Sequence, residues 1–158
     1  MKINAKDLIP LLGKTSYDPD VKTFLASVGI TKAPKLAPQD FHAYVSNKKI
    51  GLEITFRDEA HIKVKPSEYD EGSLVLVNMT LYADDSTGFK PFAGELPHGL
   101  RFDFELKECI EKIGKPAWKS KDIANVRWDF KGYSVLVAFD KEYEIIFEVS
   151  LQLPKLYS

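Results

Sequence analysis

The side chains best suited to chemistry in this 158-residue sequence are three histidines and one cysteine. His42, His61 and His98 stand far apart, and none has another potential ligand at a spacing typical of a metal site. His61 alternates onto the polar face of an expected strand, and His98 lies in a Pro/Gly-rich connection with no catalytic partner nearby. We therefore expect neither a metal nor another cofactor.

The single cysteine, Cys109, excludes an intrachain disulfide and lies on the apolar face of an expected helix. A nucleophilic thiol needs an exposed position that lowers its pKa, whereas the neighbouring Glu108 and Glu111 would raise the thiol pKa. A buried, unreactive thiol is the favoured interpretation.

Carboxylates gather in two turns, in the stretch SEYDEG from residue 67 and at Asp84-Asp85. Paired carboxylates perform acid–base catalysis when a shaped cleft holds them, but adjacent acids in a turn are usually just solvated. The stretch GFKPFAGELPHG, from residue 88, lacks the Gly-Lys-Ser/Thr ending of a phosphate-binding loop. We expect no enzyme, and a hydrolase that uses carboxylates is kept as an alternative.

The composition is that of a folded domain with balanced charge. The apolar fraction is 44%, the aromatic fraction is 12% and the formal net charge is −1. This apolar load is enough for a sizeable core and excludes a disordered chain. Because there is no basic excess, no nucleic-acid partner is expected. No sustained apolar run indicates a signal peptide or a membrane span, so we expect a cytoplasmic protein without a membrane partner.

Three segments have the periodicity and the end signals of helices: residues 5–12, 19–28 and 104–113. The second has the clearest start, because Asp18 is placed to cap the helix and Pro19 suits its first position. The third is expected to follow a cap at Asp103 and to end at Gly114.

Other segments alternate apolar and polar residues, as strands do: 41–46, 50–57, 60–65, 74–82, 126–130, 133–139 and 145–153. The connection 84–100 carries apolar side chains that should pack on the domain. The residues of the second half that are expected to be mainly buried are Trp128, Phe130, Val135, Val137, Ile145, Phe147 and Val149.

The order helix, Gly-Lys, polar turn and strands occurs twice, as LIPLLGK from residue 8 and as CIEKIGK from residue 109. This weak internal repeat predicts a single domain, residues 1–158, built of two similar halves, 1–86 and 87–158. Antiparallel meanders with helices on one face make an α+β fold. Each half alone would leave its sheet uncovered, so we expect the two to share one core.

The stretches PFAGELPHGLRFDFELKECIEKIGKPAWKSK, from residue 91, and VRWDFKGYSVLVAFD, from residue 126, carry a resemblance to a known family. The chain resembles small bacterial proteins with the pattern PF.G.LP.GL, a helix ending in an apolar residue and GKP, and then WD and Tyr. These are similar to the immunity partners of bacterial polymorphic toxins. The plan is also similar to the repeated unit of β-lactamase-inhibitor-like folds, which bind proteins. The resemblance implies a protein that binds and neutralises a cognate toxin encoded nearby.

An immunity protein needs complementarity and slow dissociation, with aromatic anchors in its interface. Tyr17 in TSYDPD and Tyr69 in SEYDEG are both flanked by acids, although a tyrosine in a turn often packs only on its neighbours. The alternative is a non-catalytic binding module for a small ligand or another protein, which a deep pocket would favour. The predicted partner-binding residues are Tyr17, Glu68, Tyr69, Asp70, Glu71, Asp84 and Asp85.

Overall fold

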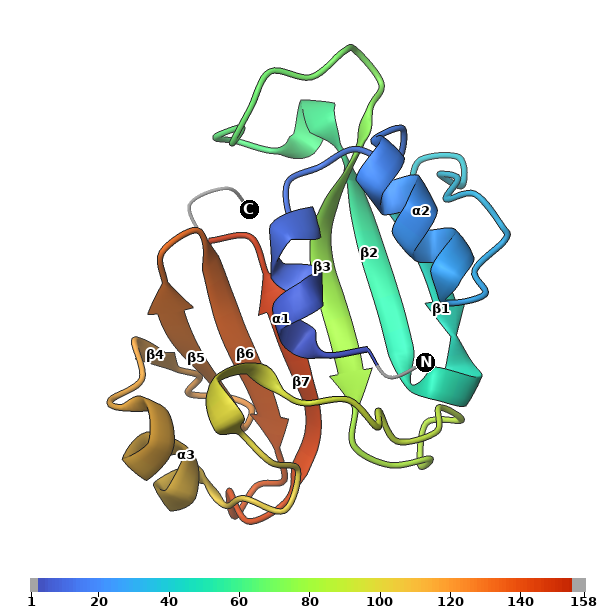
Figure 1. The fold of residues 1–158 in the computed structure, drawn as a ribbon. Coiled ribbons are helices and arrows are strands. Elements are labelled where there is room, and N and C mark those ends of the chain that lie inside the picture. Colours follow the sequence, from blue (N-terminus) through green and yellow to red (C-terminus); the bar gives the residue numbers. More distant parts are fainter. Residues whose placement is uncertain (1–2, 155–158) are drawn as a thin grey trace.

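The chain forms an antiparallel sheet with helices on one of its faces (Figure 1). The structure is a computed structural model that describes residues 3–154. The helices of this part are α1 (Ala5–Leu8), α2 (Pro19–Ser27) and α3 (Leu106–Ile113), with 3₁₀ turns η1 (Ile9–Leu11), η2 (Lys48–Ile50), η3 (Glu59–His61) and η4 (Pro97–Gly99). Its strands are β1 (His42–Asn47), β2 (Leu52–Asp58), β3 (Leu74–Tyr82), β4 (Trp118–Lys119), β5 (Asn125–Phe130), β6 (Tyr133–Phe139) and β7 (Ile146–Gln152). The predicted α+β class is confirmed.

The strands of residues 3–154 make one sheet in the order β1-β2-β3-β7-β6-β5-β4, with every pair antiparallel. The first half of the chain supplies β1–β3 and the second half supplies β4–β7. The two meanders join where β3 pairs with β7, with Asn78 opposite Gln152 and Tyr82 opposite Glu148. This long-range pairing makes one continuous sheet from two sequence-local units.

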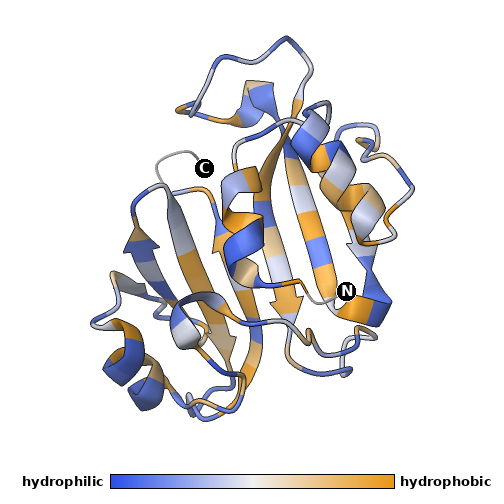
Figure 2. Cartoon of the chain, viewed as in Figure 1, coloured by the Kyte–Doolittle hydropathy of each residue, from blue (hydrophilic) through white to orange (hydrophobic). Residues whose placement is uncertain are grey.

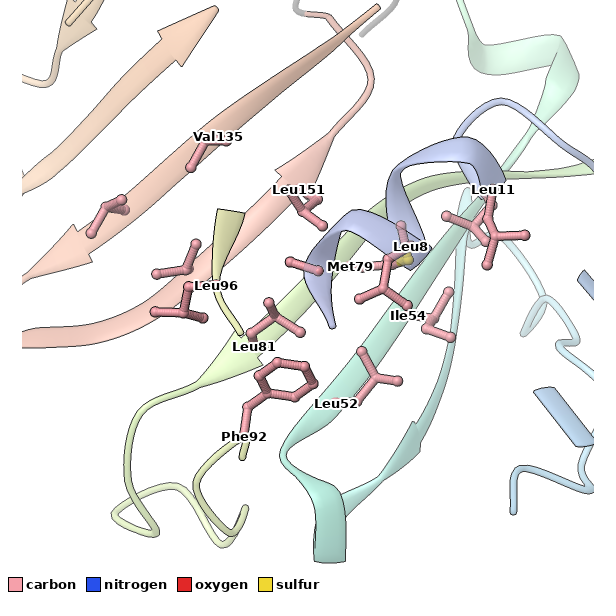
Figure 3. Packing of buried hydrophobic residues seen from close by; sticks show 14 of the residues in the cluster. Leu8, Leu11, Leu52, Ile54, Met79, Leu81, Phe92, Leu96, Val135 and Leu151 are labelled. Carbon is pink, nitrogen blue, oxygen red and sulfur yellow. The ribbon is translucent and has the colours of Figure 1, made fainter. Parts of the chain in front are cut away.

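The helices cover one face of the sheet and enclose the core against it (Figure 1). Hydrophobic and hydrophilic residues alternate along β2 (Figure 2), and the hydrophobic ones, Leu52, Ile54 and Phe56, are buried in the core. Figure 3 shows Leu8 of α1 beside Ile54 and Met79 of the sheet, and all three are fully buried. One core cluster contains residues of both halves, as expected.

The connection between the halves is fixed against the first helix. Ala5 N donates to Glu95 O (2.8 Å), and Glu95 N donates to Asn4 Oδ1 (2.9 Å). Gly94 permits this crossing, since a Cβ at that position would lie 1.6 Å from Ile3 O. Close backbone packing therefore accounts for the glycine of the PFAGELP stretch. The apolar side chains of the connection are buried, as predicted: Phe89, Phe92, Leu96 and Leu100.

The strand predicted over residues 60–65 is wrong. Asp58 accepts a hydrogen bond from the backbone N–H of Ala60 (3.1 Å) and starts the turn η3, which ends the extended conformation of β2. The segment pairs with none of the described strands. Ile62 is buried in a small side cluster, whereas Val64 is 49% exposed, so the alternation did not mark a sheet face.

At the start of the last strand, the buried and exposed positions are the reverse of those predicted. Ile145 and Phe147, predicted to be buried, are 54% and 45% exposed, whereas Ile146 is buried. The register between β6 and β7 shifts at this point, because an extra residue of β7 forms a bulge. Beyond the bulge Val149 is buried as predicted. Among the other predicted core residues, Phe130 is half-buried and the following are buried: Trp128, Val135 and Val137.

Helix α3 begins two residues later than predicted and has a different cap. Its N-cap is Glu105, whose backbone N–H donates to Glu108 Oε1 (3.0 Å). Asp103, the predicted cap, instead pairs with Arg101 at 2.7 Å. Gly114 ends the helix as predicted, with a φ of 93°.

The two Gly-Lys turns of the repeat lead to different strand pairings. Gly13 N donates to Leu76 O (2.8 Å), and Thr15 bridges Val75, so the first turn runs along the start of β3. After Gly114 the chain forms β4, which pairs with β5 at the edge of the sheet. The halves therefore correspond in their meanders and differ in how the Gly-Lys turn joins the sheet.

Trp128 should be a main contributor to the stability of the second half. Its side chain is 2% exposed, and its Nε1 donates to Gly114 O (2.8 Å). Trp128→Ala leaves a cavity and an unpaired carbonyl, so we expect a loss of about 3–5 kcal/mol in the free energy of unfolding. Denaturant titration measures this loss. Trp118→Ala, at a tryptophan 38% exposed, is the matched control, and equal losses for the two variants would contradict the core position of Trp128.

Candidate binding site on the open face of the sheet

The sheet face opposite the helices carries polar and aromatic side chains in rows that cross the strands. Successive residues of a strand point to opposite faces, so the side chains that alternate with the core gather here. This face is turned away from the viewer in Figure 1. The strand register places one row across β1, β2, β3, β7, β6 and β5, consisting of Tyr44, Thr55, Asn78, Gln152, Ser134 and Asp129.

A hollow of about 390 Å³ lies on this open face, and each of the seven strands contributes to its lining. A flat sheet would hold the outermost strands roughly 29 Å apart, because neighbouring strands are separated by about 4.8 Å. The sheet therefore curves around the open face, so that both of its edges reach the same hollow. The lining residues that carry its chemistry are His42, Tyr44, Arg57, Asn78, Trp118 and Arg127.

One side of the hollow is formed by Trp118 and Arg127, which are register partners on β4 and β5. The Arg127 guanidinium lies 5.3 Å from the centroid of the Trp118 ring. Arg127 Nε also donates to Asp129 Oδ1 (2.9 Å), which offsets its charge. Tyr44 of β1, on the other side, is 58% exposed. Trp, Tyr and Arg are the residue types most enriched in binding hot spots.

Arg57 of β2 forms no ion pair with another residue of the described chain. Its Nε is buried and has no hydrogen-bond partner within residues 3–154. Its Nη1 lies 3.5 Å from His42 Nε2. Burial lowers the pKa of His42 and the Arg57 charge lowers it further, while Asp40 acts in the opposite direction. His42 is therefore neutral at pH 7, beside a guanidinium that forms no ion pair within residues 3–154.

Asn78 adds a second unsatisfied polar atom to the hollow. Its Nδ2 donates to Thr80 Oγ1 (3.0 Å), but its Oδ1 is buried with no partner among the residues that the structure describes. Buried polar atoms in folded proteins nearly always have a partner in the protein or in water. Both of these atoms belong to residues that line the hollow, so they add to its polar character.

The same face becomes acidic toward the end of β3. Tyr82 donates to Glu53 Oε1 (3.2 Å) and is the register partner of Glu148. Burial raises the pKa of Glu148 and Glu53 raises it further; burial and both carboxylates raise the pKa of Tyr82. The open face thus has a basic hollow and an acidic end.

The predicted partner-binding residues lie at opposite ends of the sheet and not in one site. Residues 68–71 precede β3 and residues 84–85 follow it, so this nine-residue strand separates the two turns, by roughly 30 Å at strand geometry. Tyr17 is 64% exposed at the first of these ends, where Ser16 N donates to Leu74 O (2.9 Å). None of the seven predicted residues lines the hollow.

Two of these residues have contacts that stabilise the fold. Tyr69 is half-buried, donates its hydroxyl proton to Gly13 O (2.5 Å) and packs on the side cluster around Ile62. Asp84 accepts a hydrogen bond from Ser86 N (2.9 Å), and its bonds with the Ser86 hydroxyl and backbone lower the pKa of Asp84. The part of these residues in recognition stays a prediction. The exposed members of the set, besides Tyr17, are Glu68, Asp70, Glu71 and Asp85.

His98 has a partner that the sequence did not reveal. Its Nε2 lies 2.5 Å from the Tyr133 hydroxyl, and its ring stacks on Phe130 with 4.0 Å between centroids. Burial lowers the pKa of His98 and raises that of Tyr133. These residues are 35 positions apart, so no local spacing connects them. Residues 3–154 hold no cluster of three or more His, Cys, Asp or Glu side chains that could bind a metal ion.

The open-face site could not be recognised from the sequence. Its residues are scattered over strands whose polar positions were assigned to solvent, and only the long-range register brings Arg57, Asn78 and Gln152 together. The available signal was Trp118, a large aromatic residue in an otherwise polar turn. An exposed tryptophan of this kind favours a contact surface over a core position.

Comparison with known proteins finds no matching family model, no matching curated protein and no matching solved structure. Within the described residues, no helix has both the length and the apolar character needed to cross a membrane.

We expect His42 to titrate below its ordinary pKa of 6.5, because burial and Arg57 both disfavour its protonated form. Since the unfolded chain then binds this proton more readily, His42 makes the fold less stable as the pH falls through 6.5. Arg57→Gln should raise the pKa of His42 in an NMR titration of the imidazole signals. His98, whose pKa burial alone lowers, is the internal control. A His42 pKa that Arg57→Gln leaves unchanged would refute the coupling.

Cys109 should be chemically inert in the folded protein. It is fully buried, and burial, with a smaller effect of Glu108, raises the pKa of its thiol to about 11. We expect thiol reagents to label Cys109 in denaturant and to leave it unmodified under native conditions. Cys109→Ser should lower stability and leave binding intact. Rapid labelling of the native protein would reverse this assignment.

Proposed function

We propose that this protein is a non-catalytic immunity protein, which binds a cognate toxin on the open face of its sheet and holds it inactive. The observation that carries the proposal is the hollowed sheet face, where Tyr44, Trp118 and Arg127 accompany unsatisfied polar atoms. The resemblance to the immunity partners of polymorphic toxins supplies the class of partner. We place this action in the cytoplasm, where a protein with one cysteine and no intrachain disulfide fits the reducing environment.

The sheet holds this surface rigid before a partner arrives. Strands β2, β3, β7, β6 and β5 are each paired on both sides, so their side chains project from a fixed backbone. Preorganisation lowers the entropy that is lost on binding, and a well-packed interface dissociates slowly. Slow dissociation is what an immunity protein requires, because a released toxin regains its activity.

The charge pattern of the open face favours a partner with an extended surface. Arg57 lies opposite Val75 near the start of β3, and Tyr82 with its two glutamates lies at the strand end, so roughly 23 Å of strand separates the basic hollow from the acidic end. A protein surface can contact both regions, and opposite charges would fix its orientation. The turn of residues 68–71 lies at the Arg57 end, where its acids would act as rim charges.

The hollow also favours a second function, the binding of a small ligand. Its volume of about 390 Å³ falls within the range of roughly 300–1,000 Å³ for small-molecule sites, and several polar groups converge on it. A small ligand would fill the hollow without contacting the acidic end of the face. A bound molecule found in the purified protein would favour this function over toxin binding.

Co-purification with the product of the neighbouring toxin gene tests the immunity function. Tyr44→Ala and Trp118→Ala should each weaken the complex by about tenfold or more, as the truncation of hot-spot aromatics does. Tyr17→Ala distinguishes the two predicted surfaces, since Tyr17 is a similarly exposed tyrosine that lies outside the hollow, beside an acidic turn. The reverse order, a strong effect of Tyr17→Ala and none at Tyr44 or Trp118, would move the interface from the open face to the acid-flanked turns.

Protection of cells that express the toxin gives a second readout of the same function. Combined replacement of Glu68, Asp70 and Glu71 by Ala should reduce protection modestly, because rim charges act mainly on the association rate. Thermal melts confirm that each variant folds. A wild-type protein that captures no neighbouring toxin and protects no cell would remove the immunity function.

A further inference from the structure

Apart from the phenol of Tyr44, the ionisable side chains that line the hollow are all basic. They are His42, Arg57 and Arg127, and no Asp or Glu is among the lining residues. Arg127 is already paired with Asp129 at 2.9 Å. Arg57 is therefore the lining cation that has no ion pair within the described part of the chain.

The hydrogen-bonding capacity of Arg57 is largely unused. A guanidinium offers five N–H donors in a planar fork. The Nε of Arg57 has no partner within residues 3–154, and its Nη1 faces the neutral His42 at 3.5 Å, which is the outer limit of a hydrogen bond. Desolvating a charge without pairing it is costly, so a partly buried arginine is ordinarily found with an anion.

The polar side chains that line the hollow on the strand row beside Arg57 are neutral. Thr55, Asn78 and Gln152 follow one another along the row of the register next to Arg57. They can orient a bound group through hydrogen bonds without competing for the guanidinium charge. The aromatic rings of Tyr44 and Trp118 offer apolar surface to the atoms that carry that group.

We propose that the hollow binds a carboxylate, which the Arg57 fork holds as its counter-ion, and that this carboxylate is an Asp or Glu side chain of the toxin. The assignment of the carboxylate to the toxin depends on the proposed function, whereas the assignment of a carboxylate site depends only on the surroundings of Arg57. A carboxylate matches the guanidinium fork in shape, and its single charge balances one unpaired arginine. A phosphate monoester carries more charge and would need a second free cation, but Arg127 is engaged by Asp129.

Titration of the full-length protein with a blocked glutamate, N-acetyl-glutamate N-methylamide, tests the site without the toxin. The corresponding blocked glutamine is the matched neutral probe. At constant ionic strength we expect saturable NMR shifts of the Arg57 Nε–H and His42 ring signals with the glutamate probe and none with glutamine. The bound carboxylate offsets the Arg57 charge, so the pKa of His42 should rise. Equal responses to the two probes would overturn the proposal.

Substitutions assign the response to the arginine fork. Arg57→Gln should abolish the saturable shifts, and Arg57→Lys, which keeps the charge and loses the fork, should weaken binding by roughly tenfold. Arg101→Gln is the control, because Arg101 is an exposed arginine already paired with Asp103 at 2.7 Å. A folded Arg57→Gln variant with an unchanged response would overturn the assignment. Should this variant fail to fold, the two probes on the wild-type protein still decide.

The toxin complex identifies the source of the carboxylate. Arg57→Gln should speed dissociation of the toxin by about 30-fold or more, and a double-mutant cycle should couple Arg57 to one acidic residue of the toxin. Unchanged dissociation would overturn the toxin side chain as the occupant and leave the immunity function standing. A protein that binds the glutamate probe but no toxin would keep the carboxylate site and remove the immunity function.

Discussion

The pairing of β3 with β7 is the contact on which the rest of the structure depends. It joins two meanders that are local in the sequence into one sheet, and its register sets which side chains become neighbours on both faces. On one face, the joined sheet is wide enough for the helices of both halves to pack over a common core. On the other face it places Asn78 beside Gln152, between Arg57 of the first half and Trp118 of the second. Core and hollow are therefore two consequences of the same interaction.

The elements predicted well are those whose signals are local. Asp18 caps α2 through the backbone N–H of Asp20 (2.8 Å), and this end of the helix could be inferred from a few adjacent residues. The strand predicted over 60–65 failed because alternation cannot show whether a pairing partner exists. The start of β7 failed because one bulge residue reverses the inward and outward positions, and nothing in the alternation of the segment indicates a bulge.

The candidate site was less predictable than the fold, because the chemistry of its residues depends on distant neighbours. Arg57 looks like an ordinary outward-facing residue of a strand, and it is unusual only because residues 3–154 give it no ion pair. The acidic turns were chosen for their local charge density. Tyr69, the most prominent residue among them, bonds to Gly13, which lies far away in the sequence. Local composition thus identifies exposed charge, but it does not distinguish a recognition surface from a turn that braces the sheet.

The separation of the two faces has a consequence for how such a protein can change its partner. Because side chains alternate, Thr55 and Arg57 can be replaced on the open face while Ile54 and Phe56 keep the core intact. Arg57 has no ion pair within the described residues, so we expect it to lower the stability of the free protein, and a sheet that needed only stability would carry an uncharged residue there. Residues that reduce the stability of the fold are expected at positions where function requires them. The charge of Arg57 lies on the open face, whose side chains can be replaced without changing the core. The packing of the buried face of the same strands offsets the stability that is lost there.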